Sequence, residues 1–377
     1  MSRIVRSLLG AGAGILLLVA GCAPGPAAPA GRAQASSAAG GSAAAPAAPP
    51  AAPAGAAGEP SPTPLTVRMG VLGILAESGV YIALERGYFA EEGITPEFTT
   101  IDTGARAIPA LATGQLDVTG GGFSPSYVNA ALRGVGMKIV AGISRNEPDG
   151  NSGFTVMRKD LIDSGAVRDW ADLKGRTVAV PGRGSVNDYS VARGLEQGGL
   201  GIGDVEVVEL SYPDAIPALA NGNVDAAYLT EPFATLAADR GIAVKWRPTG
   251  EYLPGVSPAL MSYGPSFLAD QPEAGRRWMI AYLRGARDYT AAFRHGERRA
   301  EVVAILTRHT TVKDPALYDR MGMSTIDPNG AVNLASLADQ AAWYGEQGFL
   351  QGSIDVASLI DTRFVDAALA RLGPYQP

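Results

Sequence analysis

Five loops of this sequence carry residue types that suit the binding of a small molecule. Each follows a segment with a strand pattern: LGILAESGVY (72–81), GGFSPSY (121–127), GRGSVNDY (182–189), SYPD (211–214) and TEPF (230–233). The loops combine glycines, which allow a ligand to approach closely, with hydroxyl groups, aromatic rings and single carboxylates. Ligands of open parallel sheets bind beyond the carboxyl ends of the strands, so we expect these loops to face a ligand.

Two of the loops contain groups that favour opposite kinds of ligand. Ser185 is predicted to cap a helix after Gly184, where free N–H groups could hold an anion or a carbonyl, with Arg183 adding positive charge. Glu231 could instead accept hydrogen bonds from ligand N–H groups, and it would repel a sulfonate. Each residue has a structural alternative: Ser185 as a simple cap, Arg183 as a solvent-facing side chain, and Glu231 as a carboxylate favoured by the helix dipole.

Aromatic and hydroxyl side chains complete the candidate site. The stacking candidates are Tyr81, Phe123, Tyr127 and Tyr189, and the hydroxyl candidates are Ser78 and Ser124. Aromatic rings stack on flat ligands, and serine hydroxyls donate and accept hydrogen bonds. An aromatic side chain beside a strand end is equally compatible with a place in the core.

The sequence carries no motif of catalysis or metal binding beside these loops. It lacks the G-x-S-x-G, P-loop and H-E-x-x-H patterns, and GRGSVN lacks the third glycine of a dinucleotide fingerprint. The single cysteine, Cys22, leaves no disulfide and no thiolate cluster. We therefore expect a protein that is not an enzyme and uses no cofactor or metal. The net charge of −6 also disfavours nucleic acid as a partner.

The segments that position the loops alternate between strand and helix patterns, which predicts parallel, doubly wound sheets. The expected strands are 65–71, 94–101, 116–121 and 137–143, then 153–158, 176–181, 205–210 and 224–229. A helix is expected over 77–92. From about 265 the pattern is mostly helical, at 272–295, 297–309, 314–322 and 333–347.

One stretch of eleven residues occurs twice in the chain. IPALATGQLDV (108–118) and IPALANGNVDA (216–226) share seven positions and start 108 residues apart. Each copy is typical of a short helix that ends at a glycine and leads into a strand that opens at an aspartate. The repeat predicts two similar α/β lobes with a cleft between them, unless so simple a pattern arose by coincidence.

The N-terminus indicates export and anchoring. Arg3 and Arg6 precede an apolar stretch of about 13 residues, which suits a signal peptide and is too short to span a bilayer. It ends in Val-Ala-Gly-Cys, similar to the bacterial lipobox. We expect residues 1–21 to be a lipoprotein signal peptide, and 22–64 to be the lipidated Cys22 followed by a disordered Ala/Pro-rich tether. An ordinary signal peptide with a chance cysteine is the alternative.

Four fragments in order resemble the SsuA/THI5-like (NMT1-type) solute-binding proteins of bacterial ABC importers. They are GVYIALERGYFAEEGI, IPALATGQLDV, LKGRTVAVPGRGSVNDY and ALANGNVDAAYLTEPF, and the likeness covers most of 65–270. The stretch from Asp327 to Tyr375 is similar to the ending of riboflavin- and pyrimidine-binding members. The resemblance implies an α/β, bilobal type II periplasmic-binding-protein fold with two doubly wound lobes, a ligand cleft and a helical C-terminal part.

On that pattern the chain divides between two lobes. Lobe 1 would be 65–152 plus 264–377, lobe 2 would be 159–250, and the hinge crossovers would be 153–158 and 251–263. The resemblance implies a lipid-anchored monomer at the outer face of the bacterial cytoplasmic membrane or in the periplasm. It would deliver a small solute to ABC permease subunits with their ATPase.

Members of this family carry nitrate, sulfonates such as taurine, thiamine pyrimidine precursors and riboflavin. We expect a flat nitrogen heterocycle, riboflavin or a pyrimidine precursor, captured by hinge closure and held by stacking and by Glu231. A sulfonate or nitrate at the Ser185 helix terminus is the alternative within this class. A surface module that senses a ligand without transport is the alternative of another class.

Overall fold

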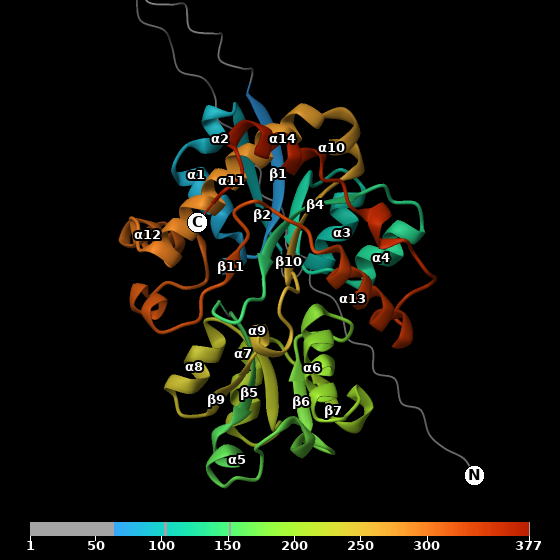
Figure 1. The fold of residues 1–377 in the computed structure, drawn as a ribbon, viewed down its shortest axis with the longest axis vertical. Coiled ribbons are helices and arrows are strands. Elements are labelled where there is room, and N and C mark those ends of the chain that lie inside the picture. The colour runs from blue at the N-terminus through green and yellow to red at the C-terminus, as the bar shows by residue number, and fades with distance from the viewer. Residues whose placement is uncertain (1–63, 102–103, 151, 377) are drawn as a thin grey trace, which may run out of the picture. The chain divides into compact units, whose positions relative to one another are not determined.

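Two β-sheets form the centre of the part of the chain that the computed structural model describes, residues 64–101, 104–150 and 152–376 (Figure 1). The expected signal peptide, Cys22 and nearly all of the expected tether lie outside these residues. Within them, no helix has the length and apolar character needed to cross a membrane.

The first sheet has six strands in the order β11-β4-β10-β3-β1-β2. They are β1 (Leu65–Val71), β2 (Ile94–Thr100), β3 (Val118–Gly121), β4 (Lys138–Arg145), β10 (Ala259–Tyr263) and β11 (Thr325–Ile326). β1 pairs in parallel with β2 and β3, whereas β10 is antiparallel to β3 and β4. The pattern predicts a parallel sheet, and β10 differs because it returns to this sheet from the second one.

The second sheet has five strands in the order β7-β6-β8-β5-β9. They are β5 (Gly153–Arg158), β6 (Thr177–Val180), β7 (Glu206–Glu209), β8 (Ala226–Thr230) and β9 (Ala243–Pro248). β6 is parallel to β7 and β8, and β5 is antiparallel to β8 and β9. Each sheet therefore joins parallel strands to one strand that enters across the lobes, β10 or β5, and the first sheet also carries β11, antiparallel to β4.

Helices pack on both sheets. Up to β10 they are α1 (Ser78–Glu85), α2 (Tyr88–Glu91), α3 (Gly104–Ala112), α4 (Pro125–Leu132), α5 (Lys159–Asp163), α6 (Val186–Gln197), α7 (Tyr212–Ala220), α8 (Phe233–Asp239) and α9 (Thr249–Tyr252). Those after β10 are α10 (Pro265–Asp270), α11 (Pro272–His295), α12 (Arg299–His309), α13 (Leu334–Glu346) and α14 (Arg363–Leu372). Short 3-10 helices are η1 (Leu75–Glu77), η2 (Trp170–Leu173), η3 (Ile202–Asp204), η4 (Pro315–Asp319) and η5 (Val356–Leu359).

The helical C-terminal part follows the sequence pattern closely. α11 spans the expected 272–295, and α12 and α13 match their expected ranges within a few residues. The helix expected over 77–92 is divided into α1 and α2, because Gly87 between them has a left-handed φ of 73°. The helix expected over 314–322 is only the short η4.

The repeated sequence forms the same corner in both lobes. α3 and α7 are each followed by a left-handed glycine, Gly114 or Gly222, with φ of 73° in both cases. Asp117 and Asp225 then each accept a backbone N–H from the strand alongside. These carboxylates tie the corner to its sheet, so the repeat records two similar structural corners.

The chain passes between the two sheets in segments that differ in position from the expected crossovers. Residues 153–158, expected as a crossover, form β5 and pair with β8 and β9. The end of the second expected crossover, 251–263, forms β10. The passages lie between β4 and β5 and between α9 and β10. The strands extend up to the passages because ladder pairing satisfies their backbone hydrogen bonds.

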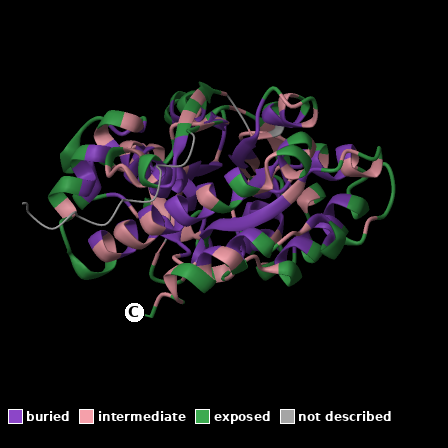
Figure 2. Cartoon of the chain, turned by 90° about the horizontal axis from the view of Figure 1, so that it is seen from above, coloured by how far each residue is buried: buried purple, intermediate pink, exposed green. Residues whose placement is uncertain are grey.

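Buried residues concentrate on the strands and on the inner faces of the helices (Figure 2). Helices α1 and α11 pack closely where Gly79 and Gly285 meet. A Cβ atom on Gly285 would lie 2.0 Å from the carbonyl oxygen of Gly79. Only glycine allows this approach, so Gly285 sets the distance between the two helices.

Replacing Gly285 with alanine should therefore lower the free energy of unfolding by about 3 kcal/mol, because the added methyl group forces the helices apart. Urea denaturation measures the change. Gly345→Ala is the matched control, since Gly345 is exposed in α13 with no atom within 4 Å of an added Cβ. It should leave stability unchanged or raise it by about 0.5–1 kcal/mol. Equal effects of the two substitutions would contradict the packing argument.

Candidate ligand site at the junction of the two lobes

The loops at the carboxyl ends of the strands meet where the two halves touch. We call the sheet containing β1, with its helices, lobe 1; the sheet containing β6, with its helices, lobe 2; and their contact the lobe junction. Gly122, after β3, lies against Val186 of α6, and a Cβ atom on Gly122 would be 3.2 Å from Val186 Cγ1. A Cβ atom on Gly184 would be 3.3 Å from Pro125 of α4. The lobes are thus in direct contact.

Glu77 occupies the loop after β1, although the loop composition does not single it out. Glu77 is 1% exposed, and its carboxylate accepts the N–H groups of residues 72, 73 and 74 at 2.9, 2.9 and 3.3 Å. Burial raises the pKa of Glu77, and the hydrogen bonds to its carboxylate oppose that shift. The chain therefore places a buried carboxylate in a ring of backbone donors.

Ser78 and Tyr81, two of the expected ligand contacts, turn toward the protein in this conformation. Ser78 is buried and donates to the carbonyl of Leu75 at 2.6 Å. The Tyr81 hydroxyl donates to Glu77 at 2.8 Å, and its ring stacks on His309 with centroids 5.1 Å apart. Burial and the nearby Glu77 carboxylate raise the pKa of Tyr81. Both side chains support the loop after β1.

Phe123, Ser124 and Tyr127 lie at the start of α4. Phe123 and Tyr127 are buried with ring centroids 6.2 Å apart, and Tyr344 of α13 packs 6.1 Å from Phe123. Ser124 is the N-cap of α4 and accepts the N–H of Tyr127 at 3.4 Å. In this conformation the two rings belong to an apolar cluster that also contains Val186 and Tyr189 of lobe 2.

In lobe 2, Gly184 and Ser185 form the start of α6. Ser185 is the N-cap, as the sequence predicts, and its hydroxyl accepts the N–H of Asp188 at 3.2 Å. Asp188 accepts the N–H of Gly184 at 2.8 Å, and Arg183 Nε lies 3.3 Å from the same oxygen. The other oxygen, Oδ1, is buried and has no hydrogen-bond partner in the described part of the chain. Burial raises the pKa of Asp188.

Tyr189 connects α6 to α13. Its hydroxyl donates to Asp339, and Arg193 Nη2 donates to the other Asp339 oxygen at 2.8 Å. The ring of Tyr189 also packs edge-on against Trp343, at 5.7 Å. The C-terminal part, expected to belong to lobe 1, therefore contacts lobe 2 directly through α13.

Glu231 is saturated by donors from the protein. Its carboxylate accepts the N–H and hydroxyl of Thr235, both at 3.0 Å, Lys245 Nζ at 2.6 Å and the N–H of Gly322 at 3.0 Å. Gly322 belongs to the segment leading to β11, so Glu231 ties lobe 2 to lobe 1. A ligand N–H could reach Glu231 only by replacing one of these donors.

Two rings in the loops of lobe 2 remain partly accessible. Tyr212 and Phe233 follow β7 and β8 and are half-buried, with centroids 5.6 Å apart and planes at 31°. Asn187 of α6 donates to the Tyr212 hydroxyl at 3.0 Å. The SYPD and TEPF loops contain these rings, yet nothing in the sequence distinguishes them from rings of the core.

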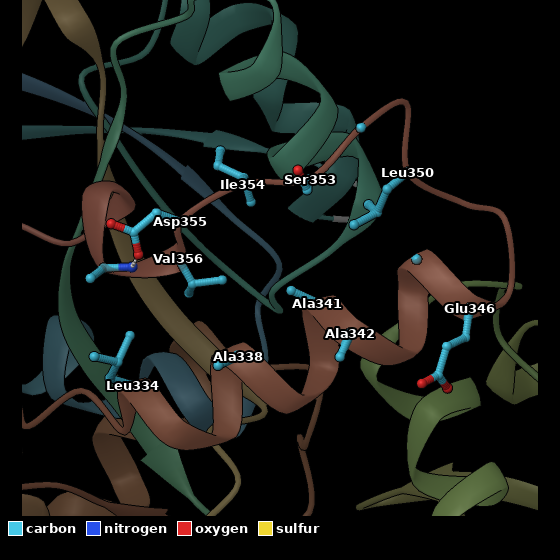
Figure 3. Close-up of a pocket in the computed structure, with 13 residues that line it drawn as sticks. Leu334, Ala338, Ala341, Ala342, Glu346, Leu350, Ser353, Ile354, Asp355 and Val356 are labelled. Atoms are coloured by element: carbon cyan, nitrogen blue, oxygen red, sulfur yellow. Dashed lines mark hydrogen bonds between the residues drawn. The ribbon is translucent and has the colours of Figure 1, made fainter.

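A pocket of about 670 Å³ lies elsewhere, between α13 and residues 350–357 (Figure 3). Its size is that of small-molecule sites. Its walls are mainly apolar, with Ala338 and Ala341 of α13 facing Ile354 and Val356. It contains none of the expected contact residues. The described residues also contain no group of three or more His, Cys, Asp or Glu side chains placed to hold a metal ion.

Comparison with known proteins identifies relatives of this chain. A family model described as NMT1/THI5 like matches residues 76–292. The taurine-binding periplasmic protein of Escherichia coli (strain K12) is 26% identical over 302 residues, which are 77% of this chain and 90% of that protein. The riboflavin-binding protein RibY of Chloroflexus aurantiacus is 26% identical over 239 residues, 62% of this chain and 64% of that protein.

Solved structures agree on the architecture. The periplasmic nitrate-binding protein NrtA from Synechocystis PCC 6803 matches with a TM-score of 0.69 at 16% identity, over 83% of this chain and 90% of that one. At this identity the likeness concerns the fold alone. It confirms the two-sheet, type II periplasmic-binding-protein fold that the sequence resemblance implies.

Replacing Glu231 with glutamine should lower the free energy of unfolding by about 2 kcal/mol, because Lys245 loses its partner while most of its surface is buried. Chemical denaturation measures this loss. The double variant Glu231→Gln with Lys245→Met should lose less, since no ammonium group is then left unpaired. A double variant as unstable as the single one would argue against the ion pair as the cause.

Replacing Asp339 with alanine should loosen α13 from α6, since it removes the acceptor for both Tyr189 and Arg193. We expect faster hydrogen exchange at the amides of α13, with little change in global stability because the Asp339 side chain is half exposed. Glu346→Ala, exposed on the same helix, is the control. Unchanged exchange in the Asp339 variant would mean that apolar packing alone holds α13.

Proposed function

This chain belongs to the NMT1/THI5-like family, and we propose that it captures a flat nitrogen heterocycle by closing its two lobes around it. The relatives named above are binding proteins, and the chain is likewise the solute-binding component of an ABC import system, working outside the cytoplasm. The identity of the solute and the residues that hold it are the content of the proposal.

Hinge closure is the mechanism that the two-lobe architecture favours. Two sheets joined by two short passages can rotate as rigid bodies. The contact of Gly122 with Val186, and the cross-lobe bonds of Glu231 and Asp339, support assigning the structure to a closed conformation. A solute would promote closure only to the extent that it binds this state better than an open one.

The ring pair Tyr212 and Phe233 carries the choice of a flat ligand. Both rings are half-buried at the starts of α7 and α8, beyond the carboxyl ends of β7 and β8, where a ring face could stack on a heterocycle. Gly184 and Ser185 lie at the same edge, where the Gly184 N–H donates to Asp188 and the Ser185 hydroxyl donates to the Gly182 carbonyl, so a ligand would contact them by displacing these bonds. The similarity to a riboflavin-binding protein supports this choice.

A sulfonate such as taurine is the second candidate. The similarity to the taurine-binding periplasmic protein extends over 90% of that relative and favours it. A sulfonate would use the start of α6, with Ser185 and Arg183 as contacts. Both candidate solutes would therefore bind to lobe 2. The heterocycle would bind by ring stacking, and the sulfonate would bind at the start of α6.

We also propose that the protein delivers its solute to a permease and is anchored by lipid. The lipobox-like sequence at Cys22 supports a monomer tethered to the membrane by lipid alone, next to permease subunits and their ATPase. A surface sensor without transport would carry the same features. Neighbouring permease and ATPase genes would support import, and a neighbouring kinase gene would support sensing.

A thermal-shift panel on the purified full chain, unfolded and refolded to remove bound ligand, tests the proposed solute. The panel holds riboflavin, hydroxymethylpyrimidine, taurine, hexanesulfonate and nitrate. A ligand at about 100 times its dissociation constant stabilises the protein by about 2.7 kcal/mol, which raises the midpoint by several degrees. We expect a shift with a heterocycle. Tyr212→Ala should reduce that shift, and Tyr375→Ala, far along the chain in the C-terminal segment, should not.

A shift with the sulfonates alone would replace the heterocycle by the second candidate. If a heterocycle raises the midpoint of the Tyr212→Ala variant as much as that of the unmodified protein, the ring pair is not part of the site.

A further inference from the structure

We propose that Glu77 and Asp188 make the lobe junction selective for an uncharged solute by occupying the backbone donors that an oxyanion would need. This inference rests on the proposed function, since it assumes that the solute binds at the lobe junction. It names a property that separates this chain from a receptor for sulfonate or nitrate.

The first donor group is in lobe 1, in the loop after β1. The N–H groups of residues 72–74 converge on one point, as in the backbone concavities that bind phosphate and other anions. Here the Glu77 carboxylate fills that point, at 2.9, 2.9 and 3.3 Å. The carboxylate lies over the end of β3, because a Cβ atom on Gly120 would be 3.5 Å from Glu77 Oε1. The chain's own anion thus occupies this position on the carboxyl edge of the sheet.

The second donor group is in lobe 2, at the start of α6, a helix of 12 residues. The N–H of Gly184 is taken by Asp188 at 2.8 Å, and the N–H of Asp188 is taken by Ser185 at 3.2 Å. Two of the N–H groups at this helix start, which would otherwise be free to attract an anion, are therefore satisfied internally.

Asp188 also keeps an oxygen without a partner. The residue is 0% exposed, and Oδ1 has no hydrogen bond to the described residues. Arg183 approaches only the oxygen that already binds Gly184. The unpaired Oδ1 of Asp188 would repel an oxyanion at this helix start, whereas it would accept a hydrogen bond from an N–H or O–H donor.

Glu231 is paired with Lys245 Nζ at 2.6 Å, and one oxygen of Asp188 is paired with Arg183 Nε at 3.3 Å. The charge of Glu231 is balanced within lobe 2. Glu77 has no such cation among its hydrogen-bond partners, which are three backbone N–H groups and the hydroxyl of Tyr81. The negative character of the junction therefore comes from Glu77, which lacks such a cation, and from the unpaired Oδ1 of Asp188.

The test measures dissociation constants for riboflavin, as the uncharged probe, and for hexanesulfonate and taurine, as anionic probes, by titration calorimetry. The variants are Asp188→Asn and Glu77→Gln, which keep an acceptor oxygen for the backbone N–H groups and remove the charge. We expect the ratio of sulfonate affinity to riboflavin affinity to rise at least tenfold in Asp188→Asn. Glu77→Gln provides an independent reading if the first variant fails to fold, as judged by circular dichroism.

Asp172→Asn is the matched control. Asp172 also accepts two backbone N–H groups, from Arg168 and Asp169. It belongs to η2, which packs near Gly194 and Gly198 at the far end of α6 from the helix start. It should leave the ratio unchanged.

Tight binding of a sulfonate by the unmodified protein overturns the charge inference and leaves solute capture standing. An unchanged ratio in both folded variants overturns it as well. Absence of binding for every probe in every protein overturns the proposed function itself, and the inference with it.

Discussion

The packing of α13 between the two lobes is the interaction on which the rest of the structure depends. Tyr344 of α13 donates to the carbonyl of Phe123 in lobe 1 at 2.9 Å, and Asp339 of α13 accepts hydrogen bonds from Tyr189 and Arg193 of lobe 2. Around these bonds, side chains of α4, α6 and α13 form a single apolar cluster. Removing that surface from water stabilises the contact, and a rotation of the lobes must give up part of it.

The free energy of lobe closure therefore includes a contribution from the protein's own contacts, in addition to that of the solute. The contacts of α13, and the bonds of Glu231 to Lys245 and Gly322, already favour the joined state. A bound solute adds to this bias only through contacts that the open state lacks. The affinity of the protein for its solute then reflects how nearly the protein's own contacts balance the open and closed states, as well as the contacts made to the solute.

The buried carboxylates explain why the expected contact residues are engaged with the protein. A carboxylate removed from water needs donors, and loops at the carboxyl ends of strands supply backbone N–H groups for it. Glu77 accepts a hydrogen bond from Tyr81, Glu231 accepts one from Lys245, and Ser185 caps α6. At the lobe junction, the polar residues that are candidates for binding a solute are therefore the same residues that hold the local structure in place.

The sequence by itself determined the features that depend on neighbouring residues. The alternation of strands and helices, the bounds of α11, the Ser124 and Ser185 caps and the left-handed Gly114 and Gly222 all follow from local backbone and side-chain preferences. The duplicated corner is visible in the sequence because the same local hydrogen-bonding problem recurs in each lobe.

Only the tertiary structure decided which groups meet. Tyr189 finds Asp339 150 residues away, and Glu231 binds the N–H of Gly322 91 residues away. The antiparallel pairing of β10 and the contact of α13 with lobe 2 likewise depend on segments that are distant in the sequence. A local pattern specifies the conformation of a segment, but the partner of a buried polar group depends on which distant segment removes it from water.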